Sequence, residues 1–279
     1  MERQLELWFT ENQTEDVALG LRIQGILHQE QTKYQNLAVL DTVAYGRMLV
    51  LDGAVQTTER DEFAYHEMIT HVPLQAHPRP RRIAIVGGGD GGAVREILKD
   101  PAVEKVVLIE IDEAVTRVAQ RFLPSIASGL GDPRVEIRFE DGIQHMQEHK
   151  SAYDVVIIDS TDPVGPASGL FQRPFYQSVY EALADDGIMV AQTESPFLEK
   201  EILQSAVEAV RAVFPRVYVY LGVVPTYPSG LWSFTLGSKK YDPTVPQRRP
   251  LSGPTRYYNF DLHTAAFTLP NFVRDLIAG

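Results

Sequence analysis

Asp154-Val-Val-Ile-Ile-Asp-Ser-Thr-Asp-Pro-Val-Gly-Pro166 is the stretch that decides the fold prediction. Its four apolar residues are typical of a buried parallel strand, and they run directly into Asp159 and Asp162. Pro163, Gly165 and Pro166 keep a helix from starting at once, so we expect the acids on a shaped loop. Ligands of open α/β sheets bind at the carboxyl ends of strands, which makes this loop a candidate site. Taken alone, the two aspartates are equally compatible with a role as turn formers.

The segments around this stretch repeat a strand-then-helix pattern. Residues 82–92, RIAIVGGGDGG, indicate a buried strand and a glycine-rich turn, and the next six residues indicate an amphipathic helix. Glycines allow a tight turn and the close approach of a ligand to the main chain. Alternation over residues 82–220 predicts a doubly wound, mostly parallel Rossmann-like α/β sheet with right-handed crossovers. Further predicted elements are strands at 105–112, 135–139, 153–158 and 187–192, helices at 113–122 and 199–214, and late antiparallel strands at 217–221 and 232–237.

The two ends of the chain have different patterns. Residues 1–62 predict a small antiparallel β domain, whose clearest signal is the hairpin turn Leu51-Asp52-Gly53. Residues 63–279 are predicted to form the Rossmann-like domain together with a C-terminal extension, whose irregular part from residue 241 packs over the core. We expect Asp61 to cap a helix that begins at Glu62 and ends at Val72-Pro73.

Composition narrows the kind of partner. The 279 residues carry 26 Lys and Arg against 37 Asp and Glu, a net charge of -11, which disfavours nucleic acid and favours cationic ligands. The absence of cysteine excludes disulfides, thiolate metal sites and cysteine nucleophiles. We find no secretory signal pattern and no apolar run near the roughly 18 residues of a membrane span. We therefore expect a cytoplasmic protein that binds neither nucleic acid nor membrane.

Acidic residues gather at the predicted strand ends. Glu110 follows the glycine turn by roughly twenty residues, a placement that suits a carboxylate holding two ribose hydroxyls. Asp112 is expected to support the turn into the next helix, and Asp141 to cap a helix or contact a ligand base. Asp90 would repel a negative ligand, which disfavours a pyrophosphate and favours a cationic adenosine such as an S-adenosyl sulfonium compound. Asp61 and Glu67 are further candidates for the same crevice.

The histidine spacing bears on ligand and metal binding. His66 lies near the edge of an apolar helix face, where packing and ligand binding are both open. His66 and His71 are five residues apart and do not meet on a helix, so we predict no metal site. A divalent cation held by the acids stays as an alternative.

These motifs together resemble the polyamine aminopropyltransferase family, and more narrowly its spermidine synthases. The resemblance runs in order through nearly the whole chain, in residues 51–62, 65–68, 85–92, 110–112, 140–142, 159–166 and 225–230. It implies transfer of an aminopropyl group from decarboxylated S-adenosylmethionine to putrescine, which yields spermidine and S-methyl-5'-thioadenosine. It also implies that the sulfonium compound is a co-substrate, that no cofactor is used, and that the protein is a homodimer or homotetramer.

The resemblance assigns roles to individual residues. Asp159 would accept the proton of the attacking amine. The nucleoside donor would be bound by Gln35, Asp90, Glu110, Asp141, Gly142 and Pro166. The polyamine would be bound by His66, Asp90, Asp159, Ser160, Thr161, Asp162 and Tyr227, with Tyr65 and Gln56 as secondary contacts.

A methyltransferase and a non-catalytic polyamine-binding protein are the alternative functions. An S-adenosylmethionine-dependent methyltransferase could use the same sheet, but Asp90 and the double-acid loop argue against it. A non-catalytic polyamine-binding protein would not require a base placed like Asp159. The acceptor stays open among putrescine, cadaverine, agmatine and spermidine, because these differ only in channel length and one distal contact.

Overall fold

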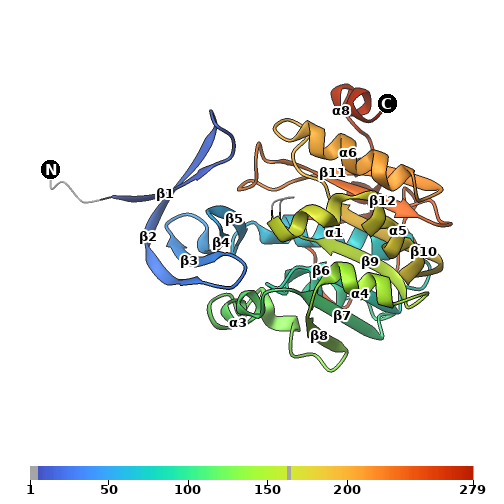
Figure 1. Ribbon diagram of the computed structural model, residues 1–279, viewed down its shortest axis with the longest axis horizontal. Coiled ribbons are helices and arrows are strands. Elements are labelled where there is room, and N and C mark those ends of the chain that lie inside the picture. The colour runs from blue at the N-terminus through green and yellow to red at the C-terminus, as the bar shows by residue number, and fades with distance from the viewer. Residues whose placement is uncertain (1–5, 162–164, 279) are drawn as a thin grey trace.

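The computed structural model describes residues 6–161 and 165–278, which form two β-sheets with helices around the larger one (Figure 1). The N-terminal sheet is antiparallel, and its five strands follow one another in chain order. Asp52 and Gly53, with φ of 48° and 87°, connect its last two strands and confirm the predicted hairpin. The strands are β1 (Leu7–Asn12), β2 (Ala18–Gln31), β3 (Asn36–Thr42), β4 (Gly46–Leu51) and β5 (Ala54–Thr58).

Strand β1 is absent from the sequence-based prediction. Glu11 is its only buried residue, while Leu7 and Trp8 are exposed. The segment therefore lacks the apolar and polar alternation that signals a half-buried strand. It pairs along its whole length with β2, from Leu7 opposite Ile23 to Asn12 opposite Ala18.

The larger sheet has seven strands in the order β11-β12-β10-β9-β6-β7-β8. From β10 to β8 all neighbours are parallel, and β12 and β11 complete the sheet as antiparallel strands. This topology confirms the predicted doubly wound fold and the late antiparallel strands. The strands are β6 (Arg82–Gly87), β7 (Lys105–Glu110), β8 (Val135–Phe139), β9 (Tyr153–Asp159), β10 (Leu183–Gln192), β11 (Arg216–Val223) and β12 (Leu231–Ser238).

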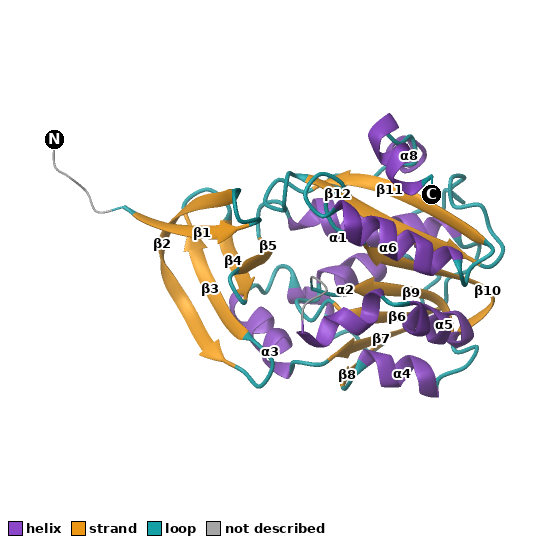
Figure 2. Ribbon diagram, turned by 45° about the horizontal axis from the view of Figure 1, so that its top comes forward, coloured by secondary structure: helices purple, strands orange, loops and turns teal. Residues whose placement is uncertain are grey.

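Helices lie on both sides of the seven-stranded sheet (Figure 2). None of the helices within the described residues has the length and apolar character that crossing a membrane requires. The α-helices are α1 (Glu62–Ala76), α2 (Gly92–Ile97), α3 (Glu113–Phe122), α4 (Gly142–Glu148), α5 (Arg173–Ala182), α6 (Lys200–Arg211), α7 (Phe260–Ala266) and α8 (Asn271–Ile277).

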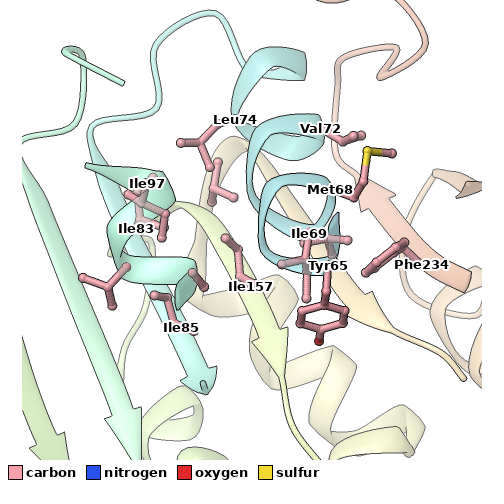
Figure 3. Close-up of a cluster of buried hydrophobic side chains, with 14 of the residues drawn as sticks. Tyr65, Met68, Ile69, Val72, Leu74, Ile83, Ile85, Ile97, Ile157 and Phe234 are labelled. Carbon is pink, nitrogen blue, oxygen red and sulfur yellow. The ribbon is translucent and has the colours of Figure 1, made fainter. Parts of the chain in front are cut away.

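The apolar strands are buried on both faces because their side chains alternate. In β6, Ile83 and Ile85 join a core formed with α1 and α2, whereas Ala84 and Val86 join a second core formed with α4 and α5. Figure 3 shows part of the first core, where Ile69 of α1 lies in one cluster with Ile83 and Ile85 of β6 and Phe234 of β12. An unbroken apolar run is thus what a strand between two helical layers requires.

Helix α1 differs from its prediction at both ends. The carboxylate of Asp61 makes no cap; it accepts hydrogen bonds from the hydroxyl of Thr58 at 2.6 Å and from the backbone N–H of Thr226 at 3.0 Å. The helix also continues through Pro73 to Ala76. Nearly every side chain of α1 is buried, and this packing outweighs the local tendency of proline to end a helix.

The loop after β9 also differs from its prediction. A 3-10 helix, η2 (Gly165–Phe171), begins within the segment where no helix was expected. The missing N–H of a proline costs nothing in a first helical turn, which explains why Pro166 is tolerated there. Asp162 lies outside the described residues, as does the side chain of Pro166.

Helix α3 connects the small sheet to the large one. Val115 and Val118 of α3 pack in one apolar cluster with Leu37, Leu49 and Leu51 of the N-terminal sheet. Both views place α3 beside β3 and next to β7 and β8 (Figures 1 and 2). The carboxyl ends of the parallel strands therefore face the N-terminal sheet.

Glu67 does not face the crevice, although the sequence made it a candidate. Its buried carboxylate accepts backbone N–H groups of Arg256, Tyr257 and Tyr258, each at 2.8 Å. It thereby ties the C-terminal extension to α1. The extension packs over the core as expected, with Val273 fully buried, but helices α7 and α8 within it were not predicted.

Replacing Glu67 by Ala should lower the free energy of unfolding by about 3 kcal/mol, because three backbone N–H groups lose a charged acceptor. Urea unfolding followed by circular dichroism measures the change. Glu201→Ala is the control, since Glu201 is largely exposed and forms an ion pair with the exposed Lys200 at 3.7 Å. Equal stability of the two variants would contradict the anchoring role of Glu67.

Candidate active site

A cavity of about 450 Å³ opens between the N-terminal sheet and the carboxyl ends of β6, β7, β9 and β10. It brings together predicted site residues that are far apart in the sequence. Those that line it are Gln35, His66, Asp90, Glu110, Asp141, Gly142, Asp159, Ser160, Thr161 and Tyr227, together with the secondary residues Tyr65 and Gln56.

The glycine turn after β6 forms the floor of this cavity. Gly87 lies opposite Asp159 in the pairing of β6 with β9. A Cβ on Gly87 would lie 2.2 Å from the backbone oxygen of Asp159, and one on Gly88 would lie 2.6 Å from its carboxylate. Both glycines have positive φ, of 80° and 68°, which other residues rarely adopt. The sequence of glycines is therefore required both for the turn and for its contact with Asp159.

Asp159 ends β9 and has the properties of a base. The hydroxyl of Tyr65 donates a hydrogen bond to its Oδ1 at 2.6 Å. Its Oδ2 has no hydrogen-bond partner among the described residues. Burial raises the pKa of Asp159 to about 6, while the nearby charge of His66 and the hydrogen bond from Tyr65 oppose the increase. The carboxylate is thus ionised at neutral pH with one oxygen available to accept a proton.

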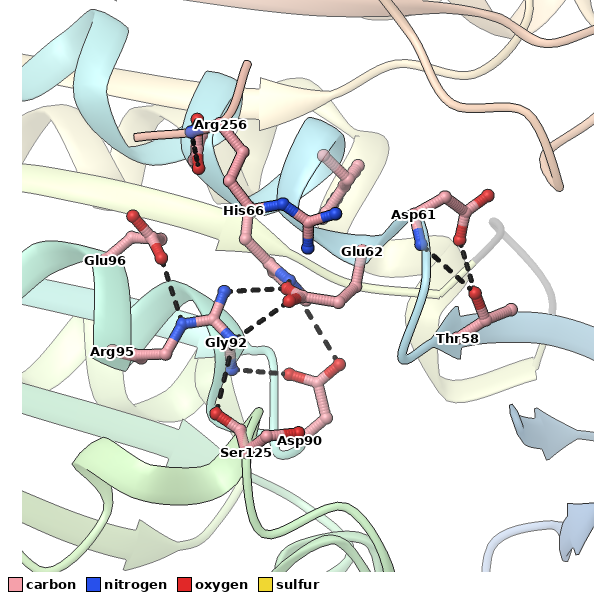
Figure 4. Close-up of polar contacts among 12 residues, drawn as sticks. Thr58, Asp61, Glu62, His66, Asp90, Gly92, Arg95, Glu96, Ser125 and Arg256 are labelled. Carbon is pink, nitrogen blue, oxygen red and sulfur yellow. Dashed lines mark hydrogen bonds and ion pairs between the residues drawn. The ribbon is translucent and has the colours of Figure 1, made fainter. Parts of the chain in front are cut away.

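Asp90 lies in the glycine turn beside His66 (Figure 4). Its Oδ1 accepts the backbone N–H of Gly92 at 2.8 Å, and its Oδ2 lies 3.5 Å from Nε2 of His66. His66 is itself buried in α1, and its Nδ1 lies 2.6 Å from the carboxylate of Glu62. His66 is therefore a buried packing residue that also lines the cavity, and its role in ligand binding stays a prediction.

The ends of β7 and β8 supply a second group of acids. Glu110 is buried and accepts N–H groups of Gly89 at 3.1 Å and Asp112 at 2.9 Å. Burial raises the pKa of Glu110 to about 7, and the neighbouring charge of Asp112 adds to the increase, while the two N–H groups reduce it. Asp112 caps α3 as predicted, and its Oδ2 accepts a hydrogen bond from Gln35 at 2.9 Å. Asp141 caps α4 through Ile143 and also lines the cavity.

The wall opposite the glycine turn is aromatic. The hydroxyl of Tyr227 donates to the backbone oxygen of Gln56 at 2.6 Å, which joins the loop before β12 to the N-terminal sheet. The ring centroids of Tyr227 and Tyr65 are 5.4 Å apart, and those of Tyr227 and Trp232 are 4.8 Å apart. Aromatic surfaces of this kind suit the methylene chain of an aliphatic amine and can face its ammonium ends.

Several residues that line the cavity are not among the predicted site residues, and Gln192, Trp232 and Glu11 are examples. Gln192 ends β10 and donates to the backbone oxygen of Ser160 at 3.1 Å. Its position at a strand end was a usable signal. Trp232 lies within a predicted strand, and Glu11 lies on the unpredicted β1, so neither had a local signal.

The divalent-cation alternative gains no support in the described part of the chain, where no group of three or more acidic or histidine side chains is arranged to hold a metal. Asp61 is turned toward Thr58 and Thr226 and Glu67 toward the C-terminal extension, so neither lines the cavity. The remaining acids line a site built for a cation or a hydroxylated ligand.

Comparison with known proteins agrees with this geometry. Residues 62–248 match the model of the spermine/spermidine synthase domain, and residues 7–59 match that of the spermidine synthase tetramerisation domain. The chain belongs to the spermine/spermidine synthase family. The resemblance found in the sequence is therefore confirmed.

Similar members of the spermine/spermidine synthase family cover almost the whole chain. The polyamine aminopropyltransferase of Caldicellulosiruptor bescii is 54% identical over 275 residues, which are 98% of this chain and 99% of that protein. That of Bacillus subtilis is 50% identical over 273 residues, again 98% and 99% of the two chains. The solved spermidine synthase from Thermotoga maritima is 40% identical, with a TM-score of 0.93 over 100% of this chain and 98% of that chain. A spermidine synthase in complex with the transition state analogue AdoDATO is 40% identical, with a TM-score of 0.94 and the same coverage.

Tyr65→Phe should raise the pKa of Asp159 above its value of about 6, because the lost hydrogen bond stabilises the ionised carboxylate. Carbon-13 NMR of the aspartate carboxyl carbons, followed as a function of pH, measures the change. Tyr176→Phe is a matched control: its hydroxyl is also buried, but it lies in the second core and should leave Asp159 unaffected. An unchanged or lower pKa in Tyr65→Phe would show that the hydrogen bond does not stabilise the carboxylate.

Proposed function

We propose that this protein is a polyamine aminopropyltransferase of the spermidine synthase type. It transfers the aminopropyl group of decarboxylated S-adenosylmethionine to putrescine and releases spermidine and S-methyl-5'-thioadenosine. The observation that carries the proposal is the pairing of a base, Asp159, with a second carboxylate, Asp90, on the floor of one cavity. That no cofactor or metal takes part, and that the protein is cytoplasmic, stay predictions.

The chemistry follows from the state of Asp159. A protonated amine cannot attack carbon, because its lone pair is occupied. Asp159, with a pKa of about 6, accepts the proton, and the neutral amine then attacks the carbon bonded to the sulfonium. A carbon–nitrogen bond forms, the carbon–sulfur bond breaks, and its electron pair neutralises the sulfur. The leaving group is already activated by its charge, so correct positioning supplies much of the rate.

The charges of the cavity select the substrates. Both substrates are cations that carry no carboxylate, and an acidic cavity attracts them. Asp90 binds the ammonium of the aminopropyl group in this proposal, and it would face the carboxylate of ordinary S-adenosylmethionine. Placing two negative charges together disfavours that compound, which is also the argument against a methyltransferase.

The remaining assignments rest on the resemblance and on the cavity wall. Glu110 holds the ribose hydroxyls, Asp141 and Gly142 lie along the adenine, and Gln35 contacts the nucleoside from the N-terminal sheet. His66, Ser160, Thr161 and Tyr227 line the polyamine channel. The proposed contacts of Asp162 with the amine and of Pro166 with the adenine lie outside the described part of the site.

Incubation with a diamine and each sulfonium donor tests the proposal by mass spectrometry. We expect an aminopropyl mass gain on putrescine with the decarboxylated donor and no methyl transfer with S-adenosylmethionine. Asp159→Asn should reduce kcat by about 10²- to 10⁴-fold, the usual contribution of a positioned base, and still bind methylthioadenosine. The exposed Asp275→Asn is its control. A competition among putrescine, cadaverine, agmatine and spermidine identifies the acceptor, and no mass gain on any of them would refute aminopropyl transfer.

We also propose that residues 1–62 form a domain that holds subunits together in a homodimer or homotetramer, with residues 63–279 as the catalytic domain. Large apolar side chains of the N-terminal sheet and its connecting turns are exposed, with Trp8 58% and Ile26 60% exposed, and exposed apolar surface can mark an interface. The group consists of Leu7, Trp8, Val17, Ile26, Leu27 and Val43.

The double variant Trp8→Glu/Ile26→Glu should have a lower molar mass in solution than the unchanged protein, because charges at a buried interface oppose association. Light scattering after size-exclusion chromatography measures the mass. Val245→Glu is the control, because Val245 is 63% exposed and lies outside the N-terminal sheet. An unchanged oligomer in the double variant would exclude this surface as the interface.

A further inference from the structure

A row of charged side chains leads from the cavity into the protein behind His66 (Figure 4). Glu62 is the first residue of α1, and its carboxylate is almost completely buried. Arg95 of α2 donates to both of its oxygens, at 3.0 Å and 2.8 Å. The same carboxylate lies 2.6 Å from Nδ1 of His66, one helical turn further along α1. Glu62 therefore joins the two helices and contacts the imidazole on the side away from the cavity.

The opposite side of the imidazole faces Asp90. Nε2 of His66 lies 3.5 Å from Oδ2 of Asp90, whose Oδ1 is held by the N–H of Gly92 at 2.8 Å. The ring also lies tightly against α2, because a Cβ on Gly92 would lie 2.2 Å from its nearest atom. Packing thus confines the plane of the ring, and the hydrogen bond with Glu62 determines which nitrogen faces Asp90.

We infer that Glu62 and Arg95 are positioning residues, which hold the imidazole of His66 with Nε2–H toward Asp90 and so keep the Asp90 carboxylate directed at the substrate ammonium. The inference rests on the proposed function, because it takes Asp90 as the group that binds the aminopropyl ammonium. Glu62 and Arg95 do not line the cavity, so they act on the substrate only through His66 and Asp90.

The protonation of the ring follows from its two neighbours. A carboxylate faces each ring nitrogen, Glu62 at hydrogen-bond distance from Nδ1 and Asp90 at ion-pair distance from Nε2. Because a carboxylate only accepts, both nitrogens carry hydrogen and the ring is an imidazolium. Burial alone would lower the pKa of His66, but the charges and hydrogen bonds of Asp90 and Glu62 outweigh it and raise the pKa well above its usual value. The pKa of Glu62 is correspondingly lowered to about 2: burial opposes this, and the contacts with His66 and Arg95 outweigh it.

A charged His66 also acts on the base. Among the described residues, Glu62 from α1, Asp90 from the glycine turn and the phenol of Tyr65, whose ring centroid is 5.4 Å away, face the ring. Its charge also acts on Asp159 at the end of β9. The positive charge of His66 lowers the pKa of Asp159 against the raising effect of burial. Loss of that charge would raise the pKa of Asp159. When the pH is lowered, the base would then be protonated, and activity lost, at a higher pH than in the unchanged protein.

Glu96 provides a matched control within the same network. It is equally buried, and it accepts a hydrogen bond from Nε of the same Arg95 at 2.9 Å. Its other contacts are with His71 and Lys99, at 2.9 Å and 2.7 Å, and it does not touch His66. If the network were purely structural, Glu62→Gln and Glu96→Gln would have the same effect on KM and on the pH profile. If Glu62 positions His66, only Glu62→Gln should change them.

The experiment compares the unchanged protein with Glu62→Gln and Glu96→Gln. Glu62→Gln should raise KM for decarboxylated S-adenosylmethionine about tenfold, the effect of losing one charged hydrogen bond. The acid limb of its kcat/KM profile should move to higher pH. Calorimetric binding of S-methyl-5'-thioadenosine, which lacks the ammonium, should stay unchanged. Glu96→Gln should keep the original KM and pH profile even where its stability falls.

Nitrogen-15 NMR of the histidine rings makes the test independent of activity and of how the variants fold. The signals of His66 are assigned as those that disappear from the spectrum of His66→Gln. In the unchanged protein these signals should show both ring nitrogens protonated at pH 7. A neutral His66 ring there would overturn the inference, as would a Glu62→Gln variant that matches Glu96→Gln in KM and pH profile. If the unchanged protein neither binds the donor nor transfers an aminopropyl group, the proposed function fails, and the NMR result still reports the state of His66.

Discussion

The close contact between the glycine turn and the end of β9 is the constraint on which the site depends. Parallel pairing of β6 with β9 puts Gly87 directly opposite Asp159, with no space for a Cβ between them. Gly89 approaches the carboxylate of Glu110 in the same way, at 2.6 Å from the position of a Cβ. A main chain without side chains can thus form a floor between acids from β9 and β7, the strands on either side of β6. A side chain at Gly87, Gly88 or Gly89 would displace Asp159 or Glu110 from the cavity.

Several carboxylates can share this cavity because each negative charge is stabilised by its own hydrogen-bond donor. Glu110 accepts two backbone N–H groups, Asp90 accepts one and faces the imidazole of His66, and Asp159 has a phenol hydroxyl. An uncompensated charge at such depth would be costly. The partners also give the acids different roles. Asp159 keeps one oxygen without a hydrogen-bond partner among the described residues and a pKa of about 6, which suits a base.

The cavity needs both sheets, and a few long-range contacts hold them in place. Packing of α3 joins the N-terminal sheet to the strand ends, and the contact of Gln35 with Asp112 fixes a side chain of the small sheet at the cavity. Tyr227 makes a second connection through Gln56. Helix α1 carries both Tyr65 and His66, and Glu67 ties it to the C-terminal extension. The extension thereby stabilises the helix that orients the base.

The sequence by itself determined the features that depend on neighbours along the chain. Apolar runs marked the buried strands, and Asp52-Gly53 marked the hairpin. Asp112 was expected to support the turn into α3, and a helix cap was one of two roles open to Asp141. Together with the glycine turn and the acids at strand ends, these patterns sufficed for the fold class and the family. Only the tertiary structure decided which polar groups meet across long separations. Asp61 turned to Thr226, Glu67 to the C-terminal extension and Glu62 to His66 and Arg95, although all three are acids at the start of one helix. Their partners are set by how α1 packs against α2, the glycine turn and the extension, and no periodicity in the sequence encodes that packing.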